Sequence, residues 1–189
     1  MSIEFAQVSD EELYKSFADG DRLSFEELLN RHQEPVYRLA FRITGNSEEA
    51  RDIAEEVFIN LWENPASYRP VAKFSTWLYR VTSNRSITHI RFRKFRSFFS
   101  LSEESHEDQF PDQASDRPDH LAEKADESSR VNRALLKLPP RQRAAIHLRY
   151  FEDLSVAEVA EAMELSLKSA ESLLFRGKQA LRDSLKERE

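Results

Sequence analysis

The chain has 189 residues, of which 33% are charged and 40% are apolar, and its formal net charge is −6. Its three glycines are too few for glycine-rich phosphate loops or a turn-rich β fold, and the lack of cysteine excludes disulfides and thiolate metal sites. The acidic N-terminus has no signal-peptide layout, and no apolar run is long enough to cross a bilayer. We therefore expect a soluble, cytoplasmic protein without membrane insertion.

The charge is distributed unevenly along the chain. Residues 1–97 carry a net charge of −1, residues 101–129 carry −8, and residues 130–189 carry +3. Because local charge governs electrostatic steering, the negative total does not exclude a nucleic-acid partner. The acidic middle segment is rich in serine and has no sustained hydrophobic period, which is typical of a linker.

The N-terminal block begins with two helical patterns. Ser9 and Glu12 have capping-box spacing and predict a short helix that ends near Gly20. The next pattern runs from residue 23 to residue 43, and Gly45 is expected to end it. Pro35 lies inside this second pattern, so we expect the helix either to bend or to be divided in two there.

The helix after Asn46 has the clearest amphipathic pattern in the chain. Its apolar residues keep helical spacing and form a broad stripe: Ala50, Ile53, Ala54, Val57, Phe58, Leu61 and Trp62. Its opposite face carries four carboxylates: Glu48, Asp52, Glu55 and Glu56. This acidic face is either an ordinary solvated surface or a docking surface for a basic partner.

A stretch without any aspartate or glutamate runs from Asn64 to Ser102. It contains eight cations: Arg69, Lys73, Arg80, Arg85, Arg91, Arg93, Lys94 and Arg96. Aromatic rings lie among them, including Tyr68, Phe74, Trp77, Tyr79, Phe92 and Phe95. Cations track phosphates and rings stack on bases, so this composition suits a single-stranded nucleic acid. The alternative is a helix whose rings, Trp77 foremost, fill the core while its cations are merely solvated.

The apolar stripe of this stretch changes after Val81. Its next positions are polar (Asn84, Arg85 and Thr88), while Ile87 and Ile90 fall on other faces of the helix. One interpretation is an irregular or deeply buried helix. The other is a surface that changes there from packing to polar recognition of bases and phosphates.

The C-terminal block is helical throughout and ends in a helix-turn-helix pattern. Pro139-Pro140 separates its first two helices, and Ser155 with Glu158 predicts a capping box for the next one. Ser166 is expected to cap a long last helix, which enters the DNA major groove in proteins of this layout. Outward side chains there can reach phosphates and base edges: Lys168, Ser169, Glu171, Ser172, Arg176 and Lys178. Gly177, within this helix, indicates either close packing or a bend.

Three segments resemble the signatures of the sigma-70 family. They are ARDIAEEVFINLW, FSTWLYRVTSNRSITHIRFRK and LPPRQRAAIHLRYFEDLSVAEVAEAMELSLKSAESLLFRGKQAL. With the short two-domain layout, they are similar to its extracytoplasmic-function (ECF) group over roughly residues 10–97 and 128–184. We therefore expect an all-α protein with two small helical domains, residues 1–97 and 128–189. An acidic flexible linker at residues 98–127 would join them, and the second domain would end in the helix-turn-helix.

The resemblance also implies which residues bind each partner. The first domain would hold core RNA polymerase through Asp52, Glu55, Glu56, Val57, Phe58 and Trp62, although Arg51 and Glu55 depart from the family's usual residues. Melted minus-10 DNA would be bound by Tyr68, Lys73, Trp77, Arg80, Asn84, Arg85, Thr88, Arg91, Arg93 and Lys94, with Thr88 standing where an aspartate is common. The minus-35 duplex would be read by Ser166, Lys168, Ser169, Glu171, Ser172, Arg176 and Lys178. ECF factors are commonly held by anti-sigma proteins, so such a partner is also expected.

The sequence therefore predicts a sigma factor that directs core RNA polymerase to specific promoters and takes part in transcription initiation. No Ser/His/Asp arrangement, metal cluster or phosphate loop is recognisable, so neither a cofactor nor a catalytic activity is expected. One alternative is a stand-alone helix-turn-helix regulator, which would leave the acidic helix and the acid-free stretch unexplained. The other, an enzyme or a purely protein-binding helical protein, has the least support.

Overall fold

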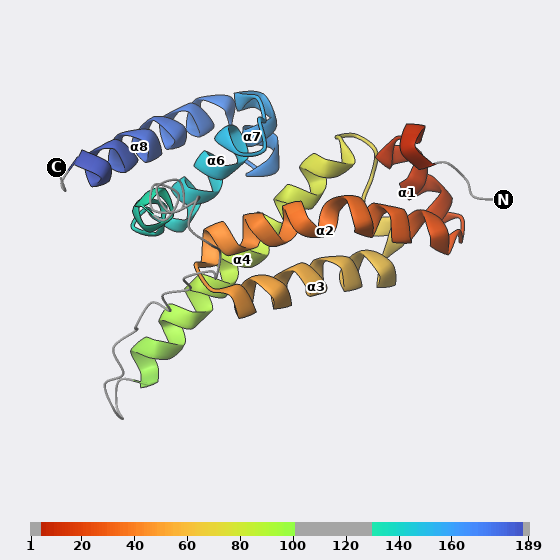
Figure 1. Cartoon of the computed structure of the whole chain (residues 1–189), viewed down its shortest axis with the longest axis horizontal. Helices are drawn as coiled ribbons and strands as arrows, with labels where there is room; N and C mark the ends of the chain where they lie inside the picture. Colours follow the sequence, from red (N-terminus) through yellow and green to blue (C-terminus); the bar gives the residue numbers. More distant parts are fainter. Residues whose placement is uncertain (1–4, 101–129, 187–189) are drawn as a thin grey trace, which may run out of the picture.

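The computed structural model describes residues 5–100 and 130–186, and every regular element within these ranges is helical (Figure 1). In chain order the elements are η1 (Phe5–Gln7), α1 (Asp10–Ala18), α2 (Arg22–Thr44), α3 (Ser47–Glu63), η2 (Pro65–Ser67), α4 (Phe74–Ser100), α6 (Pro140–Tyr150), α7 (Val156–Ala162) and α8 (Leu167–Lys186). Residues 130–136 are also helical. The expected all-α fold is confirmed, while the linker predicted at 98–127 lies almost entirely outside the described residues.

The helix ends follow the local signals of the sequence. Ser9 Oγ accepts a hydrogen bond from the Glu12 N–H, and the Glu12 carboxylate accepts one from the Ser9 N–H, which completes the predicted capping box. Ser155 and Glu158 form the same arrangement at α7. Gly45 ends α2 with φ of 74°, a left-handed conformation that glycine adopts without strain.

Pro35 does not divide α2. The helix runs unbroken for 23 residues with this proline in its interior. Leu28, Val36 and Leu39, on either side of the missing hydrogen bond, are completely buried. Their packing keeps the helix continuous where the proline cannot donate a hydrogen bond, so a division at this point is excluded.

The N-terminal domain is a bundle in which α1, α3 and α4 pack against the long central helix α2 (Figure 1). Its core combines the apolar stripe of α3 with aromatic rings from α1 and α4. Val57, Phe74 and Leu78 are completely buried. Trp77 is 5% exposed and stacks against Phe74 with 5.8 Å between ring centroids, so it is a core residue in this conformation.

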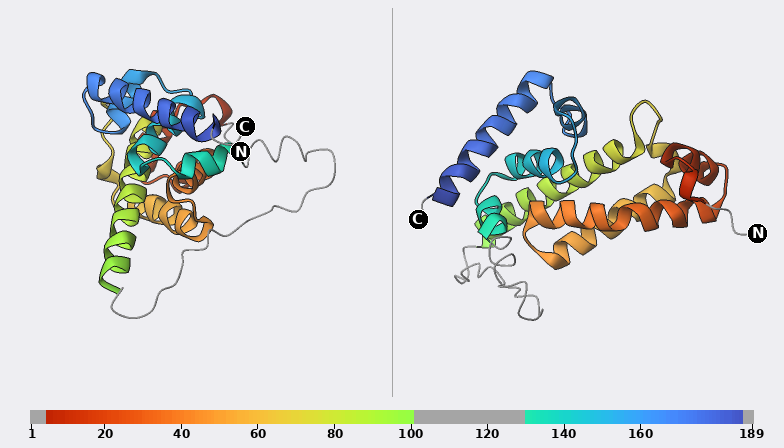
Figure 2. Two further views of the ribbon diagram at one scale, coloured as in Figure 1. Left: turned by 90° about the vertical axis from the view of Figure 1, so that its left-hand side faces the viewer. Right: turned by 45° about the horizontal axis from the view of Figure 1, so that its top comes forward.

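The C-terminal domain packs directly against α2 and α4 (Figure 2). The apolar cluster at this boundary contains Ile43 of α2 and Tyr79, Ile87 and Ile90 of α4, together with residues of α6, α7 and α8. This second core explains the change of pattern after Val81. One face of α4 packs inside its own domain, and another face packs against the C-terminal domain.

Polar groups reinforce the packing between the domains. Arg143 of α6 is 7% exposed, and its guanidinium donates hydrogen bonds to the carbonyl oxygens of Ile43, Leu136 and Leu138. Burial lowers the pKa of Arg143 to about 10, so this side chain still carries its charge at neutral pH. The two domains also approach each other closely at Gly45, where a Cβ would lie 2.5 Å from Leu136 Cδ2. The two domains therefore pack closely against each other.

Candidate polymerase and nucleic-acid interfaces

An open groove lies between α2 and α3. It is lined by apolar and polar side chains together: Phe25, Leu29, Gln33, Glu34, Tyr37, Arg51, Ala54, Glu55, Phe58, Ile59, Trp62 and Glu63. Three of them, Glu55, Phe58 and Trp62, belong to the predicted polymerase-binding set. Apolar surface surrounded by polar groups is a common composition for a protein-docking site.

Trp62 and Ile59 present exposed apolar surface in this groove. Trp62 is 42% exposed, and the neighbouring Ile59 is 54% exposed. The Trp62 ring stacks against Phe17 at a centroid distance of 5.7 Å and meets the ring of Phe25 edge-on at 4.9 Å. The guanidinium of Arg22 lies 5.8 Å from the centroid of the same ring. The indole is therefore held in position before a partner binds.

The other predicted polymerase-binding residues take different positions. Val57 is completely buried and supports the groove from the core. Asp52 is exposed but does not line the groove. Glu56 faces α4, where its carboxylate accepts a hydrogen bond from Arg85 Nη1 at 2.6 Å. The acidic residues of α3 therefore belong to more than one surface.

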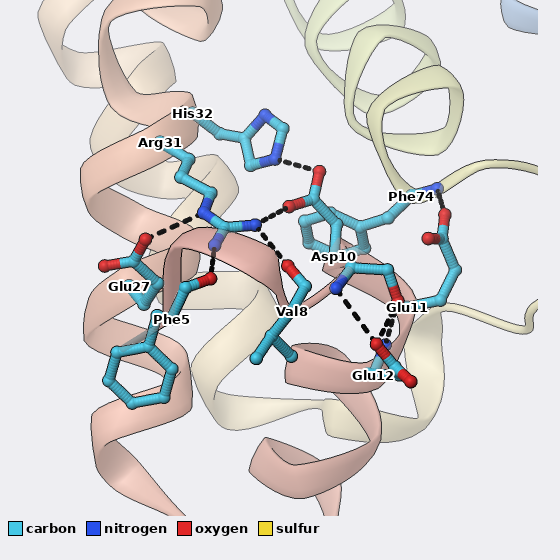
Figure 3. A network of polar contacts seen from close by, with 10 residues as sticks. Phe5, Val8, Asp10, Glu11, Glu12, Glu27, Arg31, His32 and Phe74 are labelled. Carbon is cyan, nitrogen blue, oxygen red and sulfur yellow. Dashed lines mark hydrogen bonds and ion pairs between the residues drawn. The ribbon is translucent and has the colours of Figure 1, made fainter. Parts of the chain in front are cut away.

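The start of α4 is held by a residue that is distant in sequence. Glu11 of α1 accepts a hydrogen bond from the Phe74 N–H at 2.8 Å, so a carboxylate caps the N-terminal end of α4 (Figure 3). Asp10 ties α1 to α2 by accepting hydrogen bonds from Arg31 Nη1 at 2.8 Å and His32 Nε2 at 2.7 Å. The hydrogen bond from His32 is the main reason that the pKa of Asp10 is lowered. This network orients α4 on the bundle.

Within α4, the exposed residues of the predicted minus-10 face lie along its middle and end. Asn84, Thr88, Arg91 and Lys94 are all exposed. The first three line a pocket at the boundary with the C-terminal domain. Because positions 84, 88 and 91 share one face of a helix, their side chains can contact neighbouring bases and phosphates of one strand.

Two further cations of this face are positioned by carboxylates of α3. Arg85 pairs with Glu56, and Arg93 Nη1 donates to Glu49 Oε1 at 2.9 Å. His89 Nε2 lies 3.4 Å from the same Glu49 oxygen. The side chains of Arg85 and Arg93 keep 33% and 45% exposure, so both remain accessible. Sequence reasoning missed the role of Glu49, because no local pattern connects residues 44 positions apart.

The aromatic residues of the predicted set lie in the core. Tyr68 is 3% exposed, and its hydroxyl donates to the carbonyl oxygen of Ala72 at 2.6 Å. Burial raises the pKa of Tyr68 to about 12. Trp77 is likewise buried, as described above. Among the described side chains of α4, the exposed rings are Phe92 and Phe95, each 63% exposed.

The remaining residues of the predicted face contact the C-terminal domain. Lys73 Nζ lies 2.7 Å from Glu158 Oε1, and Arg80 Nη1 lies 3.8 Å from Glu164 Oε1. Asn84 Nδ2 also donates to Glu164 Oε2 at 3.2 Å. Part of the predicted minus-10 face is thus paired with carboxylates of the C-terminal domain, although the side chains of Lys73 and Arg80 keep 71% and 39% exposure.

The predicted helix-turn-helix is formed by α7, the turn at residues 163–166, and α8. Ser166 Oγ accepts a hydrogen bond from the Ser169 N–H at 3.2 Å, as expected for a cap. The buried face of α8 includes Gly177, where a Cβ would lie 3.0 Å from Ile146 Cγ1. Gly177 therefore permits close packing of α8 on α6.

The opposite face of α8 is open to solvent. All seven predicted minus-35 residues are exposed: Ser166, Lys168, Ser169, Glu171, Ser172, Arg176 and Lys178. Phe175, at 69% exposure, also lies on this face and was missed by the sequence reasoning. The sequence did offer a clue to Phe175, because this aromatic residue does not fit the helical spacing of the buried residues of α8. An exposed ring beside Arg176 can contact the methyl group of a thymine.

The described residues contain no group of three or more His, Cys, Asp or Glu side chains placed to hold a metal ion. Within the same ranges, no helix is long and apolar enough to cross a membrane. A helix-turn-helix whose exposed face is polar, packed against a helical bundle, is a layout typical of DNA-binding proteins.

Comparison with known proteins places the chain within that class. Residues 28–96 match the family model described as Sigma-70 region 2, and residues 128–181 match the one described as Sigma-70, region 4. The ECF RNA polymerase sigma factor SigW of Bacillus subtilis is 30% identical over 92% of this chain and 95% of its own length. SigE of Mycolicibacterium smegmatis, another ECF sigma factor, is 34% identical over 89% of this chain and 65% of its own. The chain belongs to the ECF group of the sigma-70 family.

Two solved structures share the fold. CnrH, in complex with the cytosolic domain of CnrY, superposes with a TM-score of 0.70 at 22% identity, over 95% of this chain and 99% of that chain. The sigma factor RpoE from Bartonella quintana, in complex with the anti-sigma factor NepR, superposes with a TM-score of 0.67 at 18% identity, over 87% of this chain and 98% of that chain. The protein is a promoter-specific sigma factor, a transcription initiation factor rather than a stand-alone regulator.

Proposed function

We propose that the groove between α2 and α3 is the docking surface for core RNA polymerase. Trp62 and Ile59 supply exposed apolar surface, and Glu55 supplies negative charge at the side of the groove. Apolar burial accounts for most of the affinity in such a site, while the carboxylates steer a basic partner. Asp52 and Glu56 contribute to the negative field from outside the groove, and Val57 and Phe58 hold its shape.

The exposed face of α4 binds the melted minus-10 strand. Asn84 and Thr88 offer hydrogen-bonding groups for base edges, while Arg85, Arg91, Arg93 and Lys94 offer charge for phosphates. Unstacking costs a few kcal/mol per base, and contacts with a displaced strand must offset that cost. Among the described side chains, Phe92 and Phe95 offer exposed rings for stacking, whereas Tyr68 and Trp77 are buried.

The outer face of α8 reads the minus-35 element as duplex DNA. Lys168, Arg176 and Lys178 contact phosphates or guanines, Ser166, Ser169 and Ser172 add hydrogen bonds, and Glu171 can accept one from a cytosine amino group. Phe175 adds an apolar contact to thymine. Recognition is thus divided between two domains, and the polymerase carries out the synthesis.

An anti-sigma protein is the proposed regulatory partner. CnrH and RpoE, which share this fold, were both solved as complexes, with the cytosolic domain of CnrY and the anti-sigma factor NepR respectively. The groove between α2 and α3 is also a candidate surface for such a partner. The cytoplasm is the expected location, because a sigma factor acts on core polymerase there.

The observation that carries this scheme is the separation of three surfaces: the docking groove, the α4 face and the outer face of α8. Its test uses two variants that keep the groove intact, Arg91→Ala with Lys94→Ala on α4, and Arg176→Ala with Lys178→Ala on α8. Both should bind core polymerase normally. The α4 variant should bind promoter duplex but fail to expose thymines to permanganate, whereas the α8 variant should lose the upstream footprint. Equal loss of both signals in both variants would refute the division of labour.

A further inference from the structure

A cavity of about 400 Å³ lies between α3 and α4, separate from the docking groove. Ile53 and Glu56 of α3 line it together with residues of α4, and its described lining includes neither the 64–73 loop nor the C-terminal domain. Sites for small ligands commonly enclose about 300–1,000 Å³. The cavity is therefore of a size for a single nucleotide and too small for a duplex.

The cavity has an apolar floor and an aromatic wall. Ile53 is 3% exposed and belongs to the core of the N-terminal domain. Phe92 is 63% exposed, so its ring is available to a ligand. Proteins stack unpaired bases on exposed aromatic rings, and the stacking tolerates any base. Phe95 has the same 63% exposure but does not line the cavity.

An ion pair lies at the side of the cavity. Glu56 Oε2 accepts a hydrogen bond from Arg85 Nη1 at 2.6 Å, and both residues line the cavity. Their side chains keep 60% and 33% exposure, so each retains hydrogen-bonding capacity toward a ligand. The pair presents a charged acceptor beside a charged donor.

Among the four bases, guanine matches this pair best. Its Watson–Crick edge carries two adjacent donors, N1–H and the N2 amino group, next to the O6 acceptor. A carboxylate can accept from both donors while a guanidinium donates to O6. Adenine, cytosine and thymine have a single donor group at this edge, so each makes one hydrogen bond fewer with the same pair.

The cavity also holds groups for the backbone of a strand. Arg96 is exposed and lines the cavity, and Thr88 adds an exposed hydroxyl. At a rise of about 1.5 Å per residue, Arg96 lies about 16 Å along α4 from Arg85. Arg85 is thus placed for the base, while Arg96 is placed for a phosphate of a neighbouring nucleotide.

We propose that this cavity binds one unstacked guanine of the melted strand, and that Glu56 and Arg85 read its Watson–Crick edge. The proposal deepens the function proposed for α4 and rests on the assignment of that helix to the strand. The ligand is a nucleotide within a strand, because the cations outside the cavity, Arg91, Arg93 and Lys94, bind flanking phosphates that a free nucleotide lacks.

The test measures strand binding by the full chain. The probes are fluorescein-labelled strands of about 12 thymidines, either unchanged or with one central guanine, adenine or cytosine, titrated by anisotropy at one salt concentration. Wild type should bind the guanine strand about fivefold to tenfold more tightly than the other three, because one charged hydrogen bond is gained. Equal affinity for all four strands would overturn the proposal.

The reading pair is tested by Glu56→Gln. Glutamine can still accept a hydrogen bond from Arg85, but it presents an amino group where the carboxylate accepted. This variant should lose the guanine preference without losing affinity for the thymidine strand. The matched control is Glu55→Gln, which removes the same charge at an exposed neighbour that lines the docking groove instead. The control should keep the preference, and a preference that survives Glu56→Gln or disappears in the control would contradict this reading.

The aromatic wall has a control on the same helix. Phe92→Ala should weaken binding of the guanine strand about tenfold, whereas Phe95→Ala should weaken it less than threefold and keep the preference. Equal losses in the two variants would refute a role for the cavity. Urea unfolding confirms that both variants are folded.

A free nucleotide is tested as a competitor. Free dGMP should displace the guanine strand only at concentrations at least about a hundredfold above the Kd of that strand, because it lacks the flanking phosphates. Displacement near that Kd would identify a free nucleotide as the ligand and overturn the proposal.

A last pair of substitutions separates failure of the cavity from failure of the strand assignment. Arg91→Ala with Lys94→Ala removes exposed cations of α4 that do not line the cavity. This pair should weaken binding of all four strands by a similar factor and keep the guanine preference. If it changes no affinity, α4 is not the strand site and the proposed function fails. If it weakens all four strands but wild type shows no guanine preference, only the cavity proposal is refuted.

Discussion

Replacement of Trp62 by alanine gives the sharpest prediction for the docking groove. With 42% of the residue exposed, about 100 Å² of its surface remains in contact with water, given a total near 240 Å² for a tryptophan side chain. Burial of that area under a partner contributes about 2.5 kcal/mol at ~25 cal/mol per Å². If half to all of it is covered by core polymerase, Trp62→Ala weakens binding by about 10-fold to 70-fold.

The binding assay has to separate docking from folding. Trp62→Ala also removes ring contacts with Phe17 and Phe25, so it should lower the free energy of unfolding by about 2 kcal/mol. Binding to core polymerase is therefore measured where urea unfolding confirms a folded variant. Leu23→Ala is the matched control, because Leu23 is 54% exposed but does not line the groove. Wild-type affinity in a folded Trp62→Ala variant would refute the assignment of the groove.

Substitutions at three positions test the C-terminal domain. Arg176→Ala should weaken binding of the minus-35 duplex by about 1–3 kcal/mol and relax selectivity at one position, measured by competition between duplexes with single-base changes. Burial lowers the pKa of His147 despite its attraction to Glu152, so the unfolded chain binds a proton from about pH 6.5 downward while the folded chain resists protonation. The contribution of His147 to the free energy of unfolding is therefore fully present above about pH 6.5. It is lost as the pH drops toward the pKa of the folded state, by at most about 1.4 kcal/mol per pH unit. Urea unfolding at two pH values should show this slope, and His147→Gln should flatten it. Gly177→Ala should change the free energy of unfolding by less than about 0.5 kcal/mol, because a gain of up to ~1 kcal/mol in helix propensity is offset by contact with Ile146 Cγ1 at 3.0 Å. Gly177→Val should lower it by about 2 kcal/mol. Thermal unfolding measures both changes.

Elements set by local chemistry could be predicted from the sequence. The capping boxes at Ser9 and Ser155 and the helix-turn-helix depend on residues within a few positions of one another. The outer face of α8 followed from helical periodicity alone, because the buried residues of that helix leave only one face for DNA. Phe175 was not predicted as part of this face, because a hydrophobic residue is not expected to be exposed.

Interactions between distant segments could not be predicted in the same way. The cap that Glu11 supplies to α4 joins residues 63 positions apart, and no spacing rule connects them. Ile87 and Ile90 did give a signal, since they fall outside the first apolar stripe of α4. The signal was read as irregularity or recognition, whereas it marks a second packing surface for the C-terminal domain.

The division of Glu55 and Glu56 between two surfaces shows a similar limit. Both residues lie on the acidic side of α3 in a helical projection. In the structure, Glu55 lines the docking groove, while Glu56 pairs with Arg85 across to α4. Charge patterning identified an acidic face, but only the packing of α3 against α4 decides which carboxylate faces which partner.

The most direct test of the account is transcription by core RNA polymerase on a library of genomic fragments, with and without this protein. The account predicts transcripts that depend on the protein and whose start sites share two upstream motifs, one near minus-10 and one near minus-35. It also predicts that Trp62→Ala reduces these transcripts at protein concentrations that just saturate the wild type, and that a higher concentration of the variant restores them. The contrary result is tight, sequence-specific duplex binding by the protein alone, unchanged by core polymerase and without dependent transcripts.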